Sequence, residues 1–167
     1  MAAHILVAYS TRKGSTAEIA LAIAKELEKA GAAVTVSDLT SVTSVADYNA
    51  IVIGAPVYTG KISGDVAAFA WRHHDSIGRV PVAGFVTGIA PVYPKTGDIS
   101  EFTRQLEAAL DPVRPVAVTM FAGRLDAARL SFIERGMTSL LKVPTGDFRD
   151  WGAIAAWARE LPGKMGI

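Results

Sequence analysis

The sequence predicts a doubly wound α/β fold, in which helices cover both faces of a five-stranded parallel sheet of order 2-1-3-4-5. Short apolar runs alternate with longer stretches of helical periodicity, a pattern typical of parallel strands joined by crossover helices. Right-handed crossovers then give the doubly wound arrangement. The chain has 167 residues, half of them apolar, and contains no internal repeat. We therefore expect one domain spanning residues 1–167.

Each strand and helix can be placed approximately. Strands are expected over residues 4–9, 33–37, 48–54, 81–87 and 115–121, and helices over residues 17–29, 64–75, 99–110 and 147–161. Gly31 suits the C-cap of the first helix, and Asp147 suits the N-cap of the last. Residues 38–47 form a loop with one short helical turn. Pro56 is expected to end the third strand, because proline has no N–H to donate to a ladder.

Residues 122–146 are too long for a simple turn between the fifth strand and the last helix. Within them, residues 129–141 have apolar side chains at helical spacing. We therefore expect an extra helix before the last helix, packed on the edge of the domain. Such a helix either covers surface or contacts a partner or substrate.

The turn after the first strand is the clearest candidate for a binding site. It contains four hydroxyl groups, two cations and one glycine, and it lacks an acidic side chain. The N–H groups at the start of a helix have no intrahelical partner and attract anions, so this turn predicts a phosphate site. A Ser- or Thr-capped connection without a ligand is the alternative. The expected phosphate-binding residues are Ser10, Thr11, Arg12, Lys13, Gly14, Ser15 and Thr16.

Two further loops are expected to converge on this turn. In this fold a ligand lies beyond the carboxyl ends of the strands, where the strand order reverses. Tyr58 and Tyr93 would then flank a slot for a flat ring, and backbone amides would reach the polar edge of that ring. A phosphate-binding turn next to a site where a flat ring can stack predicts FMN as cofactor. The expected ring-binding residues are Pro56, Val57, Tyr58, Thr59, Gly60, Thr87, Gly88, Ile89 and Tyr93.

These stretches resemble a known family. Residues 5–20, the run Ile-Val-Ile-Gly-Ala-Pro-Val-Tyr-Thr-Gly at 51–60, and Gly-Asp-Phe-Arg-Asp-Trp at 146–151 are similar to the flavodoxin-domain family. Within that family they look most like the quinone-linked, flavodoxin-type protoporphyrinogen oxidases. The resemblance implies a flavodoxin-like fold, FMN held by residues 10–16, 55–60 and 87–93, and electron transfer on the flavin. Lys13 departs from the pattern, because many flavodoxins carry a hydroxyl residue there.

Three functions follow from this resemblance. The first is an FMN-dependent oxidoreductase that passes electrons between a porphyrinogen-like or other reduced substrate and a quinone. The second is a flavodoxin-type electron-transfer protein without its own substrate, and the third is a flavin-free binding module. Carrier flavodoxins are usually strongly acidic, whereas this chain has a net charge of +1. The charge therefore favours the enzyme.

Composition excludes several other classes. The chain has no cysteine, which removes disulfides, thiol catalysis and thiolate metal sites, and its three histidines make a metal site improbable. The small net charge argues against nucleic acid. We expect no secretory signal and no transmembrane segment, hence a cytoplasmic protein with at most peripheral membrane contact. An acidic receiver site and a cysteine phosphatase are excluded by the absence of an acidic cluster and of cysteine.

The remaining charged and aromatic residues have structural interpretations. Asp65 and Asp98 are expected at helix N-termini rather than in catalysis, and no catalytic acid–base pair is expected. Residues 72–75, Arg-His-His-Asp, read as a solvated helix end, with a proton-relay role for either histidine as the alternative. Trp151 and Trp157 are expected in the core. Residues 146–151 could instead form a functional corner with Arg149 exposed.

Overall fold

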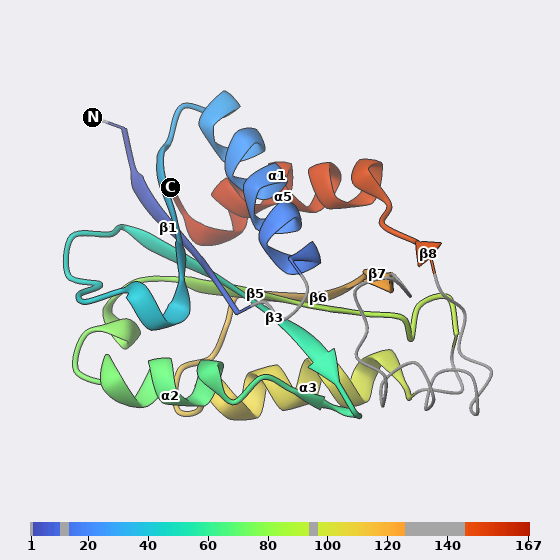
Figure 1. Ribbon diagram of the computed structural model, residues 1–167. Coiled ribbons are helices and arrows are strands. Elements are labelled where there is room, and N and C mark those ends of the chain that lie inside the picture. The colour runs from blue at the N-terminus through green and yellow to red at the C-terminus, as the bar shows by residue number, and fades with distance from the viewer. Residues whose placement is uncertain (1, 11–13, 94–96, 126–145) are drawn as a thin grey trace.

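The computed structural model describes residues 2–10, 14–93, 97–125 and 146–167 (Figure 1). Five parallel strands form the main sheet in the order β2-β1-β3-β5-β6, which is the expected order. Their bounds are β1 (His4–Tyr9), β2 (Ala33–Asp38), β3 (Ala50–Tyr58), β5 (Val82–Gly88) and β6 (Ala117–Ala122). The short strand β4 (Lys61–Ile62) pairs antiparallel with the end of β3. A separate ladder joins β7 (Arg124–Leu125) to β8 (Gly146–Asp147).

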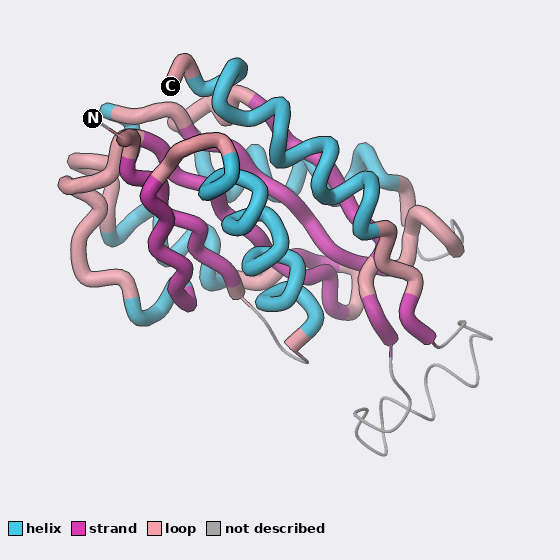
Figure 2. The backbone as a smooth tube through the Cα atoms, turned by 90° about the horizontal axis from the view of Figure 1, so that it is seen from above, coloured by secondary structure: helices cyan, strands magenta, loops and turns pink. Residues whose placement is uncertain are grey.

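Helices cover both faces of the sheet. Figures 1 and 2 show α1 (Ser15–Lys29) and α5 (Trp151–Met165) on one face, and Figure 1 shows α2 (Asp65–Arg72) and α3 (Ile99–Leu110) on the other. Short 3₁₀ turns occur at Leu39–Ser41 and Ile77–Arg79. The first of these turns is the expected helical turn within residues 38–47. The flavodoxin-like architecture predicted from the sequence is therefore confirmed.

Two apolar layers hold the helices to the sheet. Ile5 and Val7 of β1 face α1 and α5, whereas Leu6 and Ala8 face the layer under α2 and α3. All four side chains are fully buried, because successive residues of a strand point to opposite faces and both faces are covered. On α1, Ile19, Ile23 and Leu27 form the buried stripe. This packing fixes the carboxyl ends of the strands at one edge.

The expectation that Pro56 ends the third strand was wrong. β3 continues to Tyr58, and Pro56 lies opposite Thr87 of β5. Gly54 accepts a hydrogen bond from the Ser10 amide on the β1 side, and two residues later the carbonyl of Pro56 accepts from Ser63 on the same side. The missing N–H of Pro56 therefore faces the side where β1 has already ended. A proline at such a position costs no ladder bond.

Two expectations for the last helix were also wrong. α5 begins at Trp151, and its N-cap is Asp150, whose carboxylate accepts from the Ala153 amide; Asp147 belongs to β8. Trp151 is 44% exposed, whereas Trp157 packs edge-on against Phe85 and Phe121 as expected of a core residue. The extra helix expected over residues 129–141 lies outside the described residues. β7 and β8 bracket residues 126–145.

Candidate functional site

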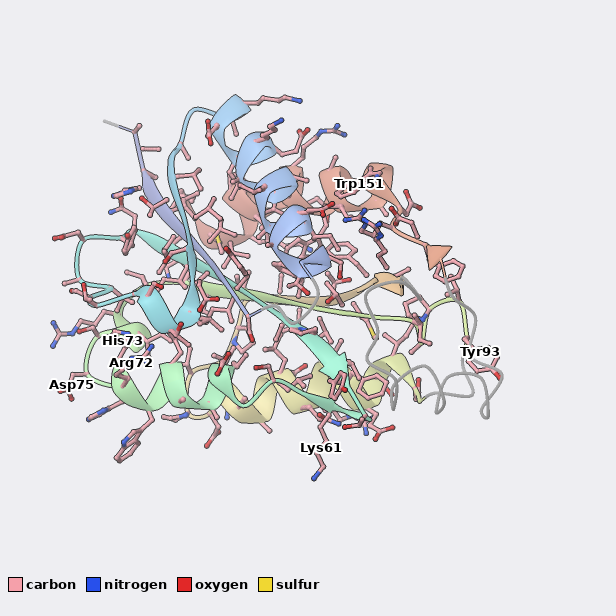
Figure 3. The ribbon with its side chains drawn as sticks, viewed as in Figure 1. Lys61, Arg72, His73, Asp75, Tyr93 and Trp151 are labelled. Carbon is pink, nitrogen blue, oxygen red and sulfur yellow. The ribbon has the colours of Figure 1, made fainter. Side chains whose placement is uncertain are left out.

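The carboxyl ends of β1, β3 and β5 lie at one edge of the sheet, so the three loops predicted to bind a ligand leave the sheet at this edge (Figure 1). Tyr93 lies there in Figure 3, whereas Arg72, His73 and Asp75 lie at the far end of the molecule. The fold therefore assembles the candidate site where the sequence predicts it. It also removes the alternative proton-relay role of His73 from this site.

The start of α1 is built for an anion. Gly14 is the N-cap, with a φ of 86°, a left-handed conformation that favours glycine. No described side chain caps this helix end, and the first intrahelical bond runs from the Glu18 amide to the Gly14 carbonyl at 3.3 Å. The amides of Ser15, Thr16 and Ala17 belong to the first turn, where helices leave N–H groups open to ligands. Thr11, Arg12 and Lys13 lie outside the described residues.

Ser10 holds the root of this loop to the start of α2. Its amide donates to the Gly54 carbonyl at 2.9 Å, and its hydroxyl lies 2.8 Å from both Ser63 Oγ and Asp65 Oδ2. One hydroxyl proton can serve one of these acceptors at a time. Ser10 is 4% exposed, whereas Ser63 and Asp65 are half-buried, and all three residues line a cavity. Asp65 is thus a first-turn residue of α2, as expected, and it also anchors Ser10.

A second hydroxyl pair connects α1 to β5. Thr16 Oγ1 lies 2.8 Å from Thr87 Oγ1, and both residues are buried. Within such a pair one hydroxyl donates and the other keeps its own proton. The contact brings the predicted phosphate loop and the predicted ring loop together through two side chains that the sequence analysis assigned to different loops.

Arg149 neutralises the one acidic residue in the first turn of α1. Its guanidinium lies 2.6 Å from Glu18 and makes two bonds to Asp147, at 2.6 and 2.8 Å. The same group stacks over Trp151 at 4.7 Å, and the Arg149 side chain is only 5% exposed. The hydrogen bond from Arg149 lowers the pKa of Asp147 to about 2. The Arg149 side chain is therefore buried, which argues against the alternative of a functional corner with Arg149 exposed.

The turn between β3 and β4 is strained. Thr59 has a φ of 48° and Gly60 a φ of 81°, the pattern of a two-residue type I′ turn. A β-branched residue with positive φ is an outlier whose cost is about 1–3 kcal/mol. The side chain of Gln105, from α3, contacts this turn twice: its Oε1 accepts from the Ile62 amide at 2.9 Å, and its Nε2 donates to the Gly60 carbonyl at 3.1 Å.

A cavity of about 410 Å³ opens beside this turn. Three of the residues that line it, Ser10, Pro56 and Tyr58, belong to the predicted site. Lys61 also borders the cavity, although its ammonium end points away from the molecule in Figure 3. The remaining lining residues, which the sequence analysis did not assign to the site, are Ile62, Ser63, Gly64 and Asp65.

The third loop, which follows β5, forms a turn held by hydrogen bonds within its own backbone. The amides of Val92 and Tyr93 both donate to the Ile89 carbonyl, at 3.0 and 2.7 Å. At the start of the loop, a Cβ on Gly88 would lie 3.3 Å from Val57 Cβ, so the second and third loops pack closely there. Tyr93 is half-buried. Thr87, Gly88 and Val57 thus lie close together at the ends of β3 and β5, while their role and that of Tyr58 and Tyr93 in binding a ring stay predictions.

Other ionisable groups have structural roles. Asp98 caps α3 by accepting from the Ser100 amide, as expected. His73 is 8% exposed rather than solvated, its Nε2 has no hydrogen-bond partner among the described residues, and burial lowers its pKa. The described part of the chain contains no group of three potential metal ligands. None of its helices is both long enough and apolar enough to cross a membrane.

A parallel sheet of this strand order, with a glycine at the N-cap of the helix that follows β1, is typical of the flavodoxin-like class of α/β proteins. Residues 6–151 match the flavodoxin domain family, and the chain belongs to that family. Among solved structures, it is similar to the Fusobacterium nucleatum flavodoxin bound to flavin mononucleotide, with a TM-score of 0.63 and 13% identity over 98% of this chain and 99% of that one. A flavodoxin from the domain Archaea matches with a TM-score of 0.57 and 13% identity, over 98% and 99% of the two chains.

Two groups of relatives carry a more specific name. Protoporphyrinogen IX dehydrogenase [quinone] of Escherichia coli strain K12 is 25% identical over 93% of this chain and 93% of its own length. The protein of the same name from Leishmania major is 26% identical over 93% of this chain and 73% of its own. The family resemblance noted from the sequence is thereby confirmed.

Proposed function

We propose that this chain binds FMN and acts as an oxidoreductase that passes electrons from a porphyrinogen-like or other reduced substrate to a quinone. The observation that supports the cofactor assignment is the start of α1, where Gly14 has a φ of 86° and no described side chain caps the helix, together with the cavity lined by Ser10 at the root of the same loop and by Tyr58. The substrate assignment comes from the names of relatives that align with 93% of this chain.

The residues present fit the proposed cofactor. The amides of the first turn of α1 bind the phosphate, and the Arg149 guanidinium removes the repulsion that Glu18 would exert on it. The β3–β4 turn and the loop after β5 hold the ring, with Val57 packed against Gly88 between them. FMN, when bound, supplies the storage of electrons on its ring system.

The protein itself then contributes position and electrostatics. Backbone amides at Thr59 and Gly60 would stabilise the negative charge that a bound flavin ring gains on reduction, because oriented N–H groups stabilise such charge without reorganisation. Thr11, Arg12 and Lys13 complete the proposed phosphate site. An electron-transfer protein without its own substrate, or a flavin-free binding module, are the alternatives. A cytoplasmic location stays a prediction.

A visible spectrum of the purified protein tests the cofactor. We expect a flavin spectrum, or tight binding of added FMN. A colourless protein that does not bind added FMN supports the flavin-free binding module. Turnover of protoporphyrinogen with a menaquinone analogue then tests the reaction. Turnover no faster than that of the same concentration of free FMN contradicts the enzyme and leaves the electron-transfer protein.

A further inference from the structure

We infer that Gln105 is a positioning residue for the flavin ring: it acts as a clamp that holds the β3–β4 turn in its strained conformation. This inference rests on the proposed function. Gln105 lies on α3, far from the turn in sequence, and no family motif named above includes it. Its amide group forms hydrogen bonds with the Gly60 carbonyl and the Ile62 amide.

The chemistry of the clamp requires an amide. The Ile62 N–H is a donor and therefore needs the oxygen of Gln105, whereas the Gly60 carbonyl is an acceptor and therefore needs its nitrogen. Among side chains of this length, glutamate supplies only the oxygen and leucine supplies neither. The two bonds lie on either side of Lys61, so together they fix the peptide planes that leave the turn.

The hairpin that carries the turn is short, and beyond its ladder the Ser63 amide joins it to β3 by donating to the Pro56 carbonyl. β4 has two residues, and only two residue pairs, Val57 with Ile62 and Tyr58 with Lys61, join it to β3. Thr59 is a poor residue for its left-handed position, and isolated two-residue hairpins are marginal in water. Without the clamp, the turn has conformations of lower strain, and Tyr58 beside the cavity would move with it.

The clamp therefore orders the β3–β4 turn, which forms the proposed wall of the ring site, before the flavin binds. A wall that is already ordered loses less conformational freedom when the ring arrives, which strengthens binding. Because the clamp acts at the ring, it should affect FMN and riboflavin by the same factor. A change at the phosphate end should affect FMN alone.

The test compares Gln105→Leu, which loses both bonds, with Gln105→Glu, which keeps an acceptor for the Ile62 amide. The matched control is Glu107→Leu, an exposed residue of the same helix. In the FMN-free protein, we expect amide hydrogen exchange at Ile62 to speed up about tenfold in the leucine variant and to remain slow in the glutamate variant and the control. Affinities for FMN and riboflavin should both fall about tenfold in the leucine variant.

Two results overturn the clamp: unchanged Ile62 exchange in the leucine variant, or unchanged affinity for both flavins. A loss confined to FMN also contradicts it, because that pattern belongs to the phosphate end. If the leucine variant does not fold, the glutamate variant tests the clamp instead. Its affinity for FMN and for riboflavin should fall by the same factor, which should be smaller than about tenfold. A wild-type protein that binds neither flavin instead overturns the proposed function, and the exchange measurement still tests the clamp.

Discussion

The two ends of the candidate site are built in different ways. At the start of α1, main-chain amides are the groups that we propose to bind phosphate, while two of the hydroxyls predicted to bind it, Ser10 and Thr16, bond to other side chains of the protein. At the β3–β4 turn, a strained backbone is held by one side chain from a distant helix. The first end is a helix start joined to other elements by hydroxyl pairs and an ion pair, whereas the second is a strained two-residue turn contacted by Gln105. We therefore expect changes at the two ends to differ in size and in which ligand they affect.

The largest effect should come from a charge at the α1 end. Ser15→Asp places a carboxylate beside the proposed phosphate and should weaken FMN binding on the order of a hundredfold, while riboflavin binding is unchanged. Ser15→Asn, which has nearly the same shape and no charge, is the control. Fluorescence titrations with both flavins measure the effect. Equal losses for FMN and riboflavin would place the phosphate elsewhere.

Removing Arg149 should have the next largest effect. Arg149→Met retains an apolar stem near Trp151 but leaves the Glu18 carboxylate uncompensated in the first turn of α1. We expect FMN affinity to fall about tenfold. The double variant Arg149→Met/Glu18→Gln should recover most of that loss. Arg159→Met, which removes an exposed partner of Glu26, is the control, and failure of the double variant to recover affinity contradicts the charge argument.

Relief of strain at the other end should increase stability. Thr59→Asn places a residue that tolerates positive φ in the first central position of the turn, and should raise the free energy of unfolding by about 1 kcal/mol. Denaturant unfolding of the FMN-free protein measures this change. Thr40→Asn, in an exposed turn near Asp38, is the matched control. A loss of stability in the Thr59 variant would mean that the threonine makes a contact worth more than the strain.

The smallest effect is on the free energy of unfolding at acidic pH. The pKa of Asp147 in the folded protein, about 2, lies below its ordinary value of 3.8, because Arg149 donates hydrogen bonds to the carboxylate. The pairing therefore stabilises the fold above about pH 4, and this contribution is lost as the pH falls toward 2. It should be no larger than about 1 kcal/mol, since the Asp147 side chain is 43% exposed. Unfolding curves of the wild type and Asp147→Asn, measured from pH 5 to pH 2, should converge at the acid end.

Local features could be predicted from the sequence and distant contacts could not. β1, the start of α1 and the convergence of three loops could be predicted from apolar periodicity and fold topology. Both can be read from short stretches of consecutive residues. The end of β3 could not be predicted from Pro56, because the effect of a proline in a strand depends on whether the side that its nitrogen faces is paired. The Thr59-Gly60 pair between Val57-Tyr58 and Lys61-Ile62 is a two-residue hairpin pattern that was available in the sequence.

Arg149 and Gln105 could not have been found in this way. Arg149 is buried because α5 brings it to Glu18, which is 131 residues away, and Gln105 reaches the turn across 45 residues. A lone glutamine on a helix, or an arginine between two aspartates, is ordinary for an exposed surface. Trp151 was expected in the core, but it is 44% exposed and its ring packs against the Arg149 guanidinium.

Amide chemical shifts during flavin titration test the central claim most directly, namely that FMN lies between the start of α1 and the β3–β4 turn. With FMN, we predict the largest shifts at Gly14, Ser15 and Thr16 together with Thr59 and Gly60. With riboflavin, which lacks the phosphate, the shifts at Thr59 and Gly60 should remain and those at the start of α1 should largely disappear. If FMN leaves both segments unmoved, or if riboflavin moves the start of α1 as strongly as FMN does, the account is contradicted.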